Sequence, residues 1–122
     1  MKSVPFDYVR PETLDAACSY LSSDPNSLIL AGGQSLLPML SMRLARPSLL
    51  VDIGNINELK IIENKNKNIK IGSMVRQADA LKNPVINKYL PLLIKGLNHV
   101  GHPPTRARGT IGGSIAQADP SS

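Results

Sequence analysis

The sequence predicts a fold that contains both helices and strands, an α+β class of the α/β type. Three observations lead to that expectation. Short apolar runs at 28–30 and 49–53 are typical of buried strands. The pair Gly32-Gly33 follows the first run and leads into apolar residues at helical spacing, as in a strand–turn–helix unit. The stretch 75–100 has a helical pattern interrupted by proline, which predicts two or three helices. Strands that alternate with helices indicate α/β architecture.

Composition and charge exclude several classes of protein. The 122 residues include 42% hydrophobic but only 3% aromatic residues, too few for a platform that stacks single-stranded nucleic acid. The net charge of +5 is spread along the chain without a zinc-finger spacing, so we expect no nucleic-acid partner. The single cysteine excludes an internal disulfide. No apolar leader or membrane-length stretch is present, so we expect a cytoplasmic protein.

The N-terminal half is expected to contain three short strands and two helices. Residues 6–9 predict a strand, and Pro11 is expected in the first turn of the helix that follows. The apolar face of that helix comprises Leu14, Ala17, Cys18 and Leu21, which makes Cys18 a core thiol rather than a nucleophile. In the second helix, Ser35 is expected to cap the start, with Arg43 and Arg46 in the last turn.

The C-terminal half begins with an expected hairpin. Segments 59–63 and 69–72 flank a Lys/Asn loop, which we interpret as a solvated tip rather than a basic patch. After the helical stretch, Gly101 is expected to cap a helix end, and 102–108 reads as a proline-rich basic loop. His99 and His102 lack a third ligand, so we expect no metal site.

Two glycine pairs, each followed by a serine, are the candidate site. They are Gly32-Gly33-Gln34-Ser35 and Gly112-Gly113-Ser114. Glycines let amide N–H groups approach an anion, and two such turns could hold the two phosphates of a dinucleotide. The alternatives are two tight turns of an α/β domain, or a generic anion-binding α/β domain. Neither a G-x-G-x-x-G nor a P-loop pattern occurs, and no catalytic constellation is evident.

Several longer motifs resemble one known family. The chain is similar to the FAD-binding medium subunit of molybdenum hydroxylases, which include aerobic carbon monoxide dehydrogenase, xanthine dehydrogenase and related aldehyde and nicotine-type dehydrogenases. The similarity runs from about Phe6 to Ser122. The motifs that carry it are Ala31–Pro38, Arg43–Pro47, Leu50–Ile53, Val100–Pro103, Arg106–Ser114 and Ala118–Pro120.

The resemblance implies a p-cresol methylhydroxylase-type (PCMH-type) FAD-binding fold, with residues 1–122 forming the first subdomain and the start of the second. It also implies that both glycine segments contact the FAD pyrophosphate, with Asp119 near the ribityl or flavin end. Neither a catalytic acid or base nor a metal ligand is expected in this chain. The expected FAD-binding residues are Leu30, Ala31, Gly32, Gly33, Gln34, Ser35, Leu36, Thr110, Ile111, Gly112, Gly113, Ser114 and Asp119.

The implied function is electron transfer in an FAD-dependent oxidoreductase, most like carbon monoxide dehydrogenase, with xanthine, aldehyde or nicotine-type enzymes as the alternative. Electrons would pass from a molybdenum cofactor in a large subunit, through [2Fe-2S] clusters in a small subunit, to FAD and an acceptor. Family members continue beyond Pro120. The alternatives are a split gene product, whose FAD domain a further chain completes, and a truncated gene; in either case we expect this chain to be inactive alone. The alternative from another class is a truncated, non-catalytic interaction module that retains the fold.

Overall fold

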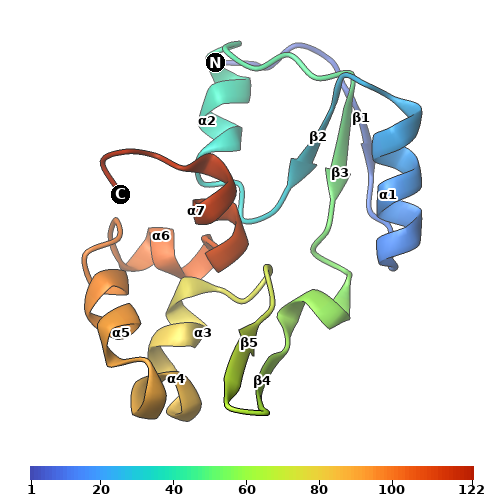
Figure 1. The fold of residues 1–122 in the computed structure, drawn as a ribbon. Helices are drawn as coiled ribbons and strands as arrows, with labels where there is room; N and C mark the ends of the chain where they lie inside the picture. The colour runs from blue at the N-terminus through green and yellow to red at the C-terminus, as the bar shows by residue number, and fades with distance from the viewer. The chain divides into compact units, whose positions relative to one another are not determined.

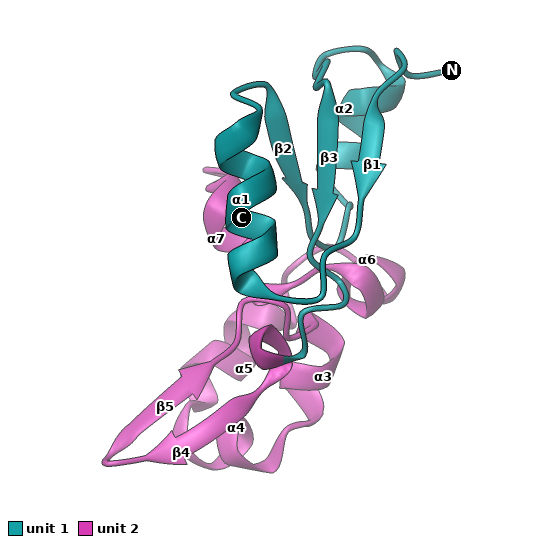
Figure 2. Cartoon of the chain, turned by 90° about the vertical axis from the view of Figure 1, so that its right-hand side faces the viewer, with its two compact units in different colours: residues 1–57 teal, residues 58–122 magenta.

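A computed structural model describes residues 1–122, which form two compact units, 1–57 and 58–122 (Figures 1 and 2). The N-terminal unit contains a parallel sheet in the order β1-β3-β2, formed by Asp7–Val9, Leu49–Asp52 and Ser27–Leu30. Helices α1 (Leu14–Ser23) and α2 (Leu36–Ser41) lie on opposite faces of this sheet (Figures 1 and 2). The three strands and two helices that the sequence predicts here are therefore present.

Strand β3 is the centre of this unit. Leu49, Leu50 and Val51 are buried, which confirms the prediction of a buried strand. The prediction that β2 is buried is wrong, because β2 is an edge strand whose Leu28 and Ile29 are 38% and 50% exposed.

The ends of both helices differ from the predictions. Helix α1 begins after Thr13, whose hydroxyl accepts a hydrogen bond from the amide of Ala16 at 3.1 Å, so Pro11 precedes the helix instead of lying in its first turn. Helix α2 ends at Ser41, and Arg43 follows in the left-handed conformation with φ of 58°. The amides of Arg43 and Leu44 donate to Leu40 O and Met39 O, which is a Schellman motif.

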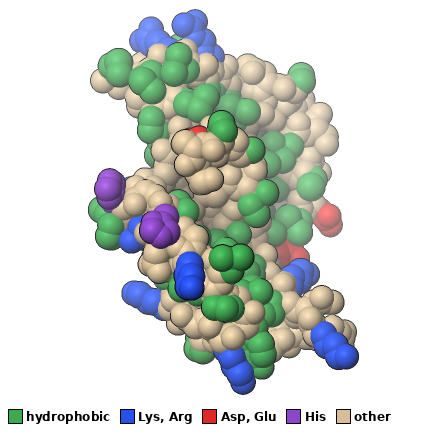
Figure 3. All heavy atoms as spheres, turned by 60° about the vertical axis from the view of Figure 1, so that its left-hand side comes forward, with side chains coloured by type: hydrophobic (Ala, Val, Ile, Leu, Met, Phe, Trp, Pro, Cys, Tyr) green, Lys and Arg blue, Asp and Glu red, His purple; other side chains and the backbone are tan.

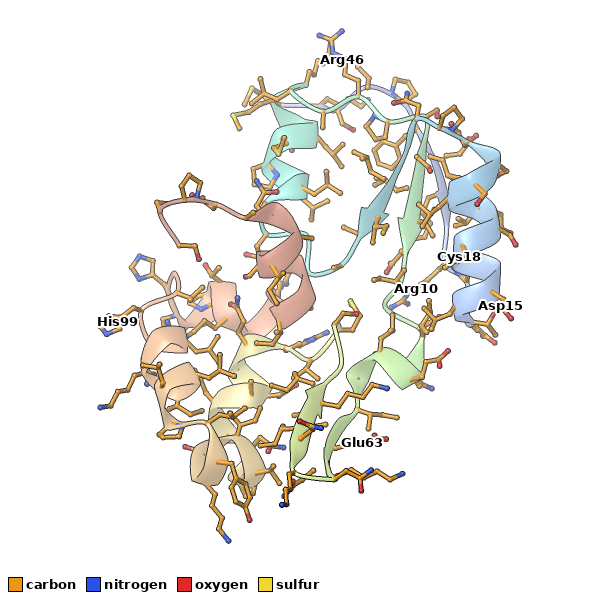
Figure 4. The ribbon with its side chains drawn as sticks, in the orientation of Figure 1. Arg10, Asp15, Cys18, Arg46, Glu63 and His99 are labelled. Carbon is orange, nitrogen blue, oxygen red and sulfur yellow. The ribbon has the colours of Figure 1, made fainter.

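Because this motif closes α2 early, Arg43 and Arg46 lie beyond the helix and not in its last turn (Figure 4 shows Arg46). Arg43 Nε instead donates to the carbonyl of Lys2 at 3.0 Å, and Arg46 Nε donates to the carbonyl of Arg43 at 3.1 Å. Both side chains thus hold loop backbone in place.

The C-terminal unit begins with the predicted hairpin. Strands β4 (Ile62–Lys65) and β5 (Asn68–Ile71) pair antiparallel, after a 3-10 helix η1 at Asn57–Lys60 that takes up the first residues of the predicted strand. Asn66 and Lys67 form the two-residue turn, with φ of 53° and 63°. Positive φ at both positions is the requirement of a type I′ turn.

Three short helices then follow, as the proline positions predict: α3 (Gln77–Lys82), α4 (Pro84–Tyr89) and α5 (Pro91–Leu97). Pro84 and Pro91 each occupy the first helical position, where the missing N–H is of no consequence. Gly101 has a φ of 51° but does not cap α5, whose C-cap is Asn98. The core of the unit is formed by Val75, Ala80, Ile86 and Leu97.

The prediction of a loop at 102–108 is wrong. Residues Pro103–Arg108 form helix α6, because Pro103 at its first position has a φ that suits a helix start. Arg106 Nη1 donates to the carbonyl of Val100 at 3.0 Å and holds the entry to this helix. Helix α7 (Ile111–Gln117) follows and contains the second glycine pair.

The hairpin turn yields a test of stability. We expect Lys67→Gly to raise the free energy of unfolding by about 0.5–1 kcal/mol, because glycine removes the left-handed strain of an L residue at a smaller entropic cost. Urea denaturation measures the change. Lys65→Gly, in β4 next to the turn, is the matched control and should lower stability; a loss of stability in both variants would contradict the strain argument.

Candidate functional site

The first glycine segment, residues 30–36, connects β2 to α2. Leu30 is the last residue of β2, and its carbonyl accepts a hydrogen bond from the amide of Ile53 at 3.1 Å. Within the N-terminal unit, none of the five successive amide N–H groups from Gly32 to Leu36 donates a hydrogen bond. Successive donors without an internal acceptor can bind an anion. The predicted turn is therefore present, and its amides are available.

Gly33 gives this segment its shape. Its φ of 76° is a conformation that L side chains rarely adopt, and a Cβ there would lie 2.9 Å from Leu37 Cδ1. The amide of Leu37 donates to the carbonyl of Gly33 at 3.0 Å and closes the first turn of α2. Ser35 occupies the N-cap position of α2, as predicted, but its backbone angles are helical and its side chain makes no capping bond, so its hydroxyl is not used to cap α2.

The second glycine segment, residues 110–114, has a different structure. It is the start of α7 rather than a turn, so the prediction of a second glycine turn is wrong. The hydroxyl of Thr110 accepts from the amide of Gly113 at 3.0 Å, and the amides of Ile111 and Gly112 donate to Val75 O and Ser73 O at 3.0 and 2.8 Å.

The amide of Ser114 donates to the carbonyl of Thr110 at 3.2 Å, so all four amides from Ile111 to Ser114 have internal acceptors. A Cβ on Gly112 would lie 2.5 Å from Ser73 Cβ, so the close approach of Ser73 explains why this position is a glycine. This segment therefore lacks the free amides that the glycine pattern led us to expect. The half-buried hydroxyl of Ser114 is its polar group of interest.

Asp119 follows α7 in an exposed turn. Its Oδ1 accepts hydrogen bonds from the amide and the hydroxyl of Ser121, at 2.9 and 2.8 Å. These bonds, first that from the amide, hold the pKa of the Asp119 carboxyl below its usual range. No hydrogen bond joins Asp119 to the second glycine segment.

Sequence reasoning missed a polar cluster at the end of β3. Asp52 accepts hydrogen bonds from the Tyr8 hydroxyl and, at 2.8 Å, from the amide of Gly54, and lies 3.3 Å from Arg10 Nε (Figure 4 shows Arg10). The hydrogen bond to Asp52, followed by burial, raises the pKa of Tyr8. Since Asp52 pairs with Leu30 in the sheet register, the cluster lies beside the start of the first glycine segment. A lone carboxylate ending an apolar strand was the only sequence signal.

Gln77 was also missed. This buried residue at the start of α3 donates from Nε2 to Ser114 Oγ at 2.7 Å. No local pattern in the sequence joins two residues 37 positions apart.

The remaining candidates do not form a site. Cys18 is exposed on α1 and is not the predicted core thiol, because Ala17 is the buried residue of that helix (Figure 4). Both histidines lie on the surface, and Lys and Arg side chains are scattered in the same view (Figure 3). No group of three or more His, Cys, Asp or Glu side chains could hold a metal ion, and no helix is long and apolar enough to cross a membrane.

Comparison with known proteins gives the family. Residues 4–122 match the family described as the FAD binding domain in molybdopterin dehydrogenase. The chain is 42% identical over 119 residues to the nicotine 6-hydroxylase medium subunit of Paenarthrobacter nicotinovorans, covering 98% of this chain and 42% of that protein. It is 38% identical over 116 residues to the carbon monoxide dehydrogenase medium chain of Hydrogenophaga pseudoflava, covering 94% and 40%.

The fold gives the same result. The crystal structure of quinoline 2-oxidoreductase from Pseudomonas putida 86 matches with a TM-score of 0.97 and 43% identity, over 100% of this chain and 43% of that one. The chain therefore belongs to the FAD-binding domain family of molybdopterin dehydrogenases, and the predicted fold class is confirmed. It spans about two fifths of the length of these relatives.

Gly33, which has a positive φ, and Gly96, which lies in a helix, yield a paired prediction. Gly33→Ala should lower the free energy of unfolding by about 1–2 kcal/mol, the strain of an L residue at positive φ. Gly96→Ala, in α5 where a Cβ would meet nothing within 4 Å, should raise it by about 0.5–1 kcal/mol. Urea denaturation of both variants decides the matter; equal effects would mean that backbone conformation does not distinguish the two positions.

Asp119 yields a prediction about pH. At pH values above the ordinary carboxyl pKa, the lowered pKa of Asp119 stabilises the folded state. This stabilisation is lost as the pH falls through the pKa that Asp119 has in the folded protein. In an NMR titration, we expect Ser121→Ala to raise the Asp119 pKa part of the way to the ordinary value, because the amide bond remains. An unchanged titration would show that the Ser121 hydroxyl has no part in the shift.

Proposed function

We propose that the chain is the N-terminal part of the FAD-binding electron-transfer subunit of a molybdenum hydroxylase. The observation that carries the proposal is the run of amides from Gly32 to Leu36, which have no acceptor in their own unit, in a chain of an FAD-binding family. A pyrophosphate is the part of FAD that such donors would bind.

The residues present fit this cofactor unequally. Ala31 and the five residues from Gly32 to Leu36 would hold phosphate oxygens through backbone amides and the Ser35 hydroxyl, with Leu30 flanking them. In the second segment, Thr110, Ile111, Gly112 and Gly113 would shape the backbone beside the cofactor, and Ser114 would donate its hydroxyl. Asp119, already bonded to Ser121, is proposed to lie nearer the ribityl chain.

When bound, FAD would supply the redox chemistry, accepting electrons and passing them to a final acceptor. The chain's own residues would bind and orient the cofactor, and we assign none of them an acid or base role. The polar cluster of Asp52, Tyr8 and Arg10 would keep the ends of β1 and β3 in place beside the first glycine segment.

The wider assignment is part of the same proposal. It comprises a small iron–sulfur subunit, a large molybdenum subunit, a chain that carries the rest of the FAD domain and a cytoplasmic location. The relatives named for nicotine and carbon monoxide chemistry are 42% and 38% identical, so these values select no substrate. The likeness to both supports a subunit of this class of oxidoreductase.

A FAD titration tests the proposal, with flavin fluorescence and thermal unfolding as readouts. The chain should be titrated alone and co-expressed with the rest of the FAD domain. A concentration about 100 times Kd would raise the apparent stability by about 2.7 kcal/mol. Gly33→Val and Gly113→Val should weaken binding, whereas Gly96→Ala should leave it unchanged. Failure of both forms to bind FAD would leave the interaction-module alternative as the explanation.

Amide NMR makes the same titration specific to each segment. The amide protons of Gly32 to Leu36 should shift strongly when FAD binds, because they gain an acceptor. Those of Ile111 to Ser114 should shift less, since each already has one. The reverse pattern would place the phosphate against the second segment and contradict the assignment.

A further inference from the structure

Gln77 is a polar residue in the core of the C-terminal unit. Its side chain is only 2% exposed, and its backbone amide donates to the carbonyl of Gly109 at 2.9 Å. Its Nε2 donates to Ser114 Oγ at 2.7 Å, while its Oε1 has no hydrogen-bond partner. A buried amide with one unpaired atom is costly, and an apolar side chain of similar length would avoid that cost. The position therefore calls for a reason beyond packing.

The neighbouring backbone is built to admit this side chain. A Cβ on Gly109 would lie 2.9 Å from Gln77 Oε1 and 3.0 Å from the carbonyl of Thr105. Gly109 thus leaves room for the amide that a larger residue would take. The backbone amide of Gln77 already fixes the start of α3 to this segment, so the side-chain bond to Ser114 is not needed for that purpose.

The bond to Ser114 decides what the serine hydroxyl can do. A hydroxyl has one hydrogen to donate and two lone pairs to accept. Because Gln77 Nε2 occupies a lone pair, the hydrogen of Ser114 remains available, and no hydrogen bond in the C-terminal unit uses it. A glutamine oxygen in the same place would take that hydrogen instead.

We infer that Gln77 is a positioning residue, whose side-chain amide keeps the Ser114 hydroxyl hydrogen directed at a phosphate oxygen of bound FAD. The inference rests on the proposed function and explains how the Ser114 hydroxyl becomes a hydrogen-bond donor in that site. In the second glycine segment, where the amides from Ile111 to Ser114 are all in use, this hydroxyl is the donor that remains. Gln77 itself touches no cofactor.

A double-mutant cycle tests the inference in the full chain, or in its complex with the rest of the FAD domain if only the complex binds. Ser114→Ala and Gln77→Met should each weaken FAD binding at least about tenfold, the effect of a lost bond to a charged group. The double variant should bind as weakly as either single variant, because Gln77 acts through Ser114. Multiplied effects, or unchanged binding by Gln77→Met, would overturn the inference.

A charged variant adds a readout that a merely structural role would not move. In Gln77→Glu, an ionised carboxylate would accept the Ser114 hydrogen, so FAD affinity should fall and recover as acid protonates the carboxyl. Burial raises a carboxyl pKa, which brings this recovery into the range of about pH 5–7. The cationic side chains of the neighbouring elements are Arg76 on the preceding segment and Arg106 and Arg108 on α6.

Gln117→Glu is the matched control, since it adds the same charge at an exposed position of α7 and should bind FAD without that recovery. A flat pH profile for Gln77→Glu at the affinity of the unaltered chain would overturn the inference. Failure of the unaltered chain and its complex to bind FAD would instead overturn the proposed function, and the inference with it. Thermal unfolding without FAD separates loss of folding from loss of binding.

Discussion

The hydrogen bonds between residues 73–77 and 109–114 are the constraint on which the C-terminal unit depends. Ser73 O and Val75 O accept from the start of α7, and the amide of Gln77 donates to Gly109 O. These bonds hold α3 and α7 in one arrangement around the core of Val75 and Ala80. They also use two amides of the second glycine segment, those of Ile111 and Gly112, while the amides of Gly113 and Ser114 donate to Thr110. The segment therefore loses its free donors partly to these long-range bonds and partly to the Thr110 cap at the start of α7.

In the N-terminal unit, by contrast, the first glycine segment keeps its amide donors free. Its segment from Gly32 to Leu36 leaves the sheet edge after Leu30, where no neighbouring backbone supplies acceptors within the unit. The positive φ of Gly33 turns the chain into α2 while the amides remain unbonded. Two nearly identical glycine motifs thus acquire different chemistry: the first offers a row of amides, and the second offers a serine hydroxyl directed by Gln77.

Much of the fold was predictable because its signals are local. The apolar run of β3, the hairpin at Asn66-Lys67 and the helices that begin at Pro84 and Pro91 each depend on side chains within a few positions. Where the predictions failed, a local signal had two meanings. Proline in 102–108 suggested a loop, although proline also suits the first position of a helix, as α6 shows. Cys18 shares a helical face with Ala17, but only Ala17 is buried.

The sequence by itself determined the family and the two glycine segments, since motif spacing and residue type are carried along the chain. Only the tertiary structure decided which amides are free, because the acceptors for the amides of Ile111 and Gly112 are Val75 O and Ser73 O, far away in sequence. The pair of Gln77 and Ser114, and the cluster of Asp52 with Tyr8, likewise join residues more than thirty positions apart. A hydrogen bond needs its two partners at one place in space, and that placement exists only once the chain has folded.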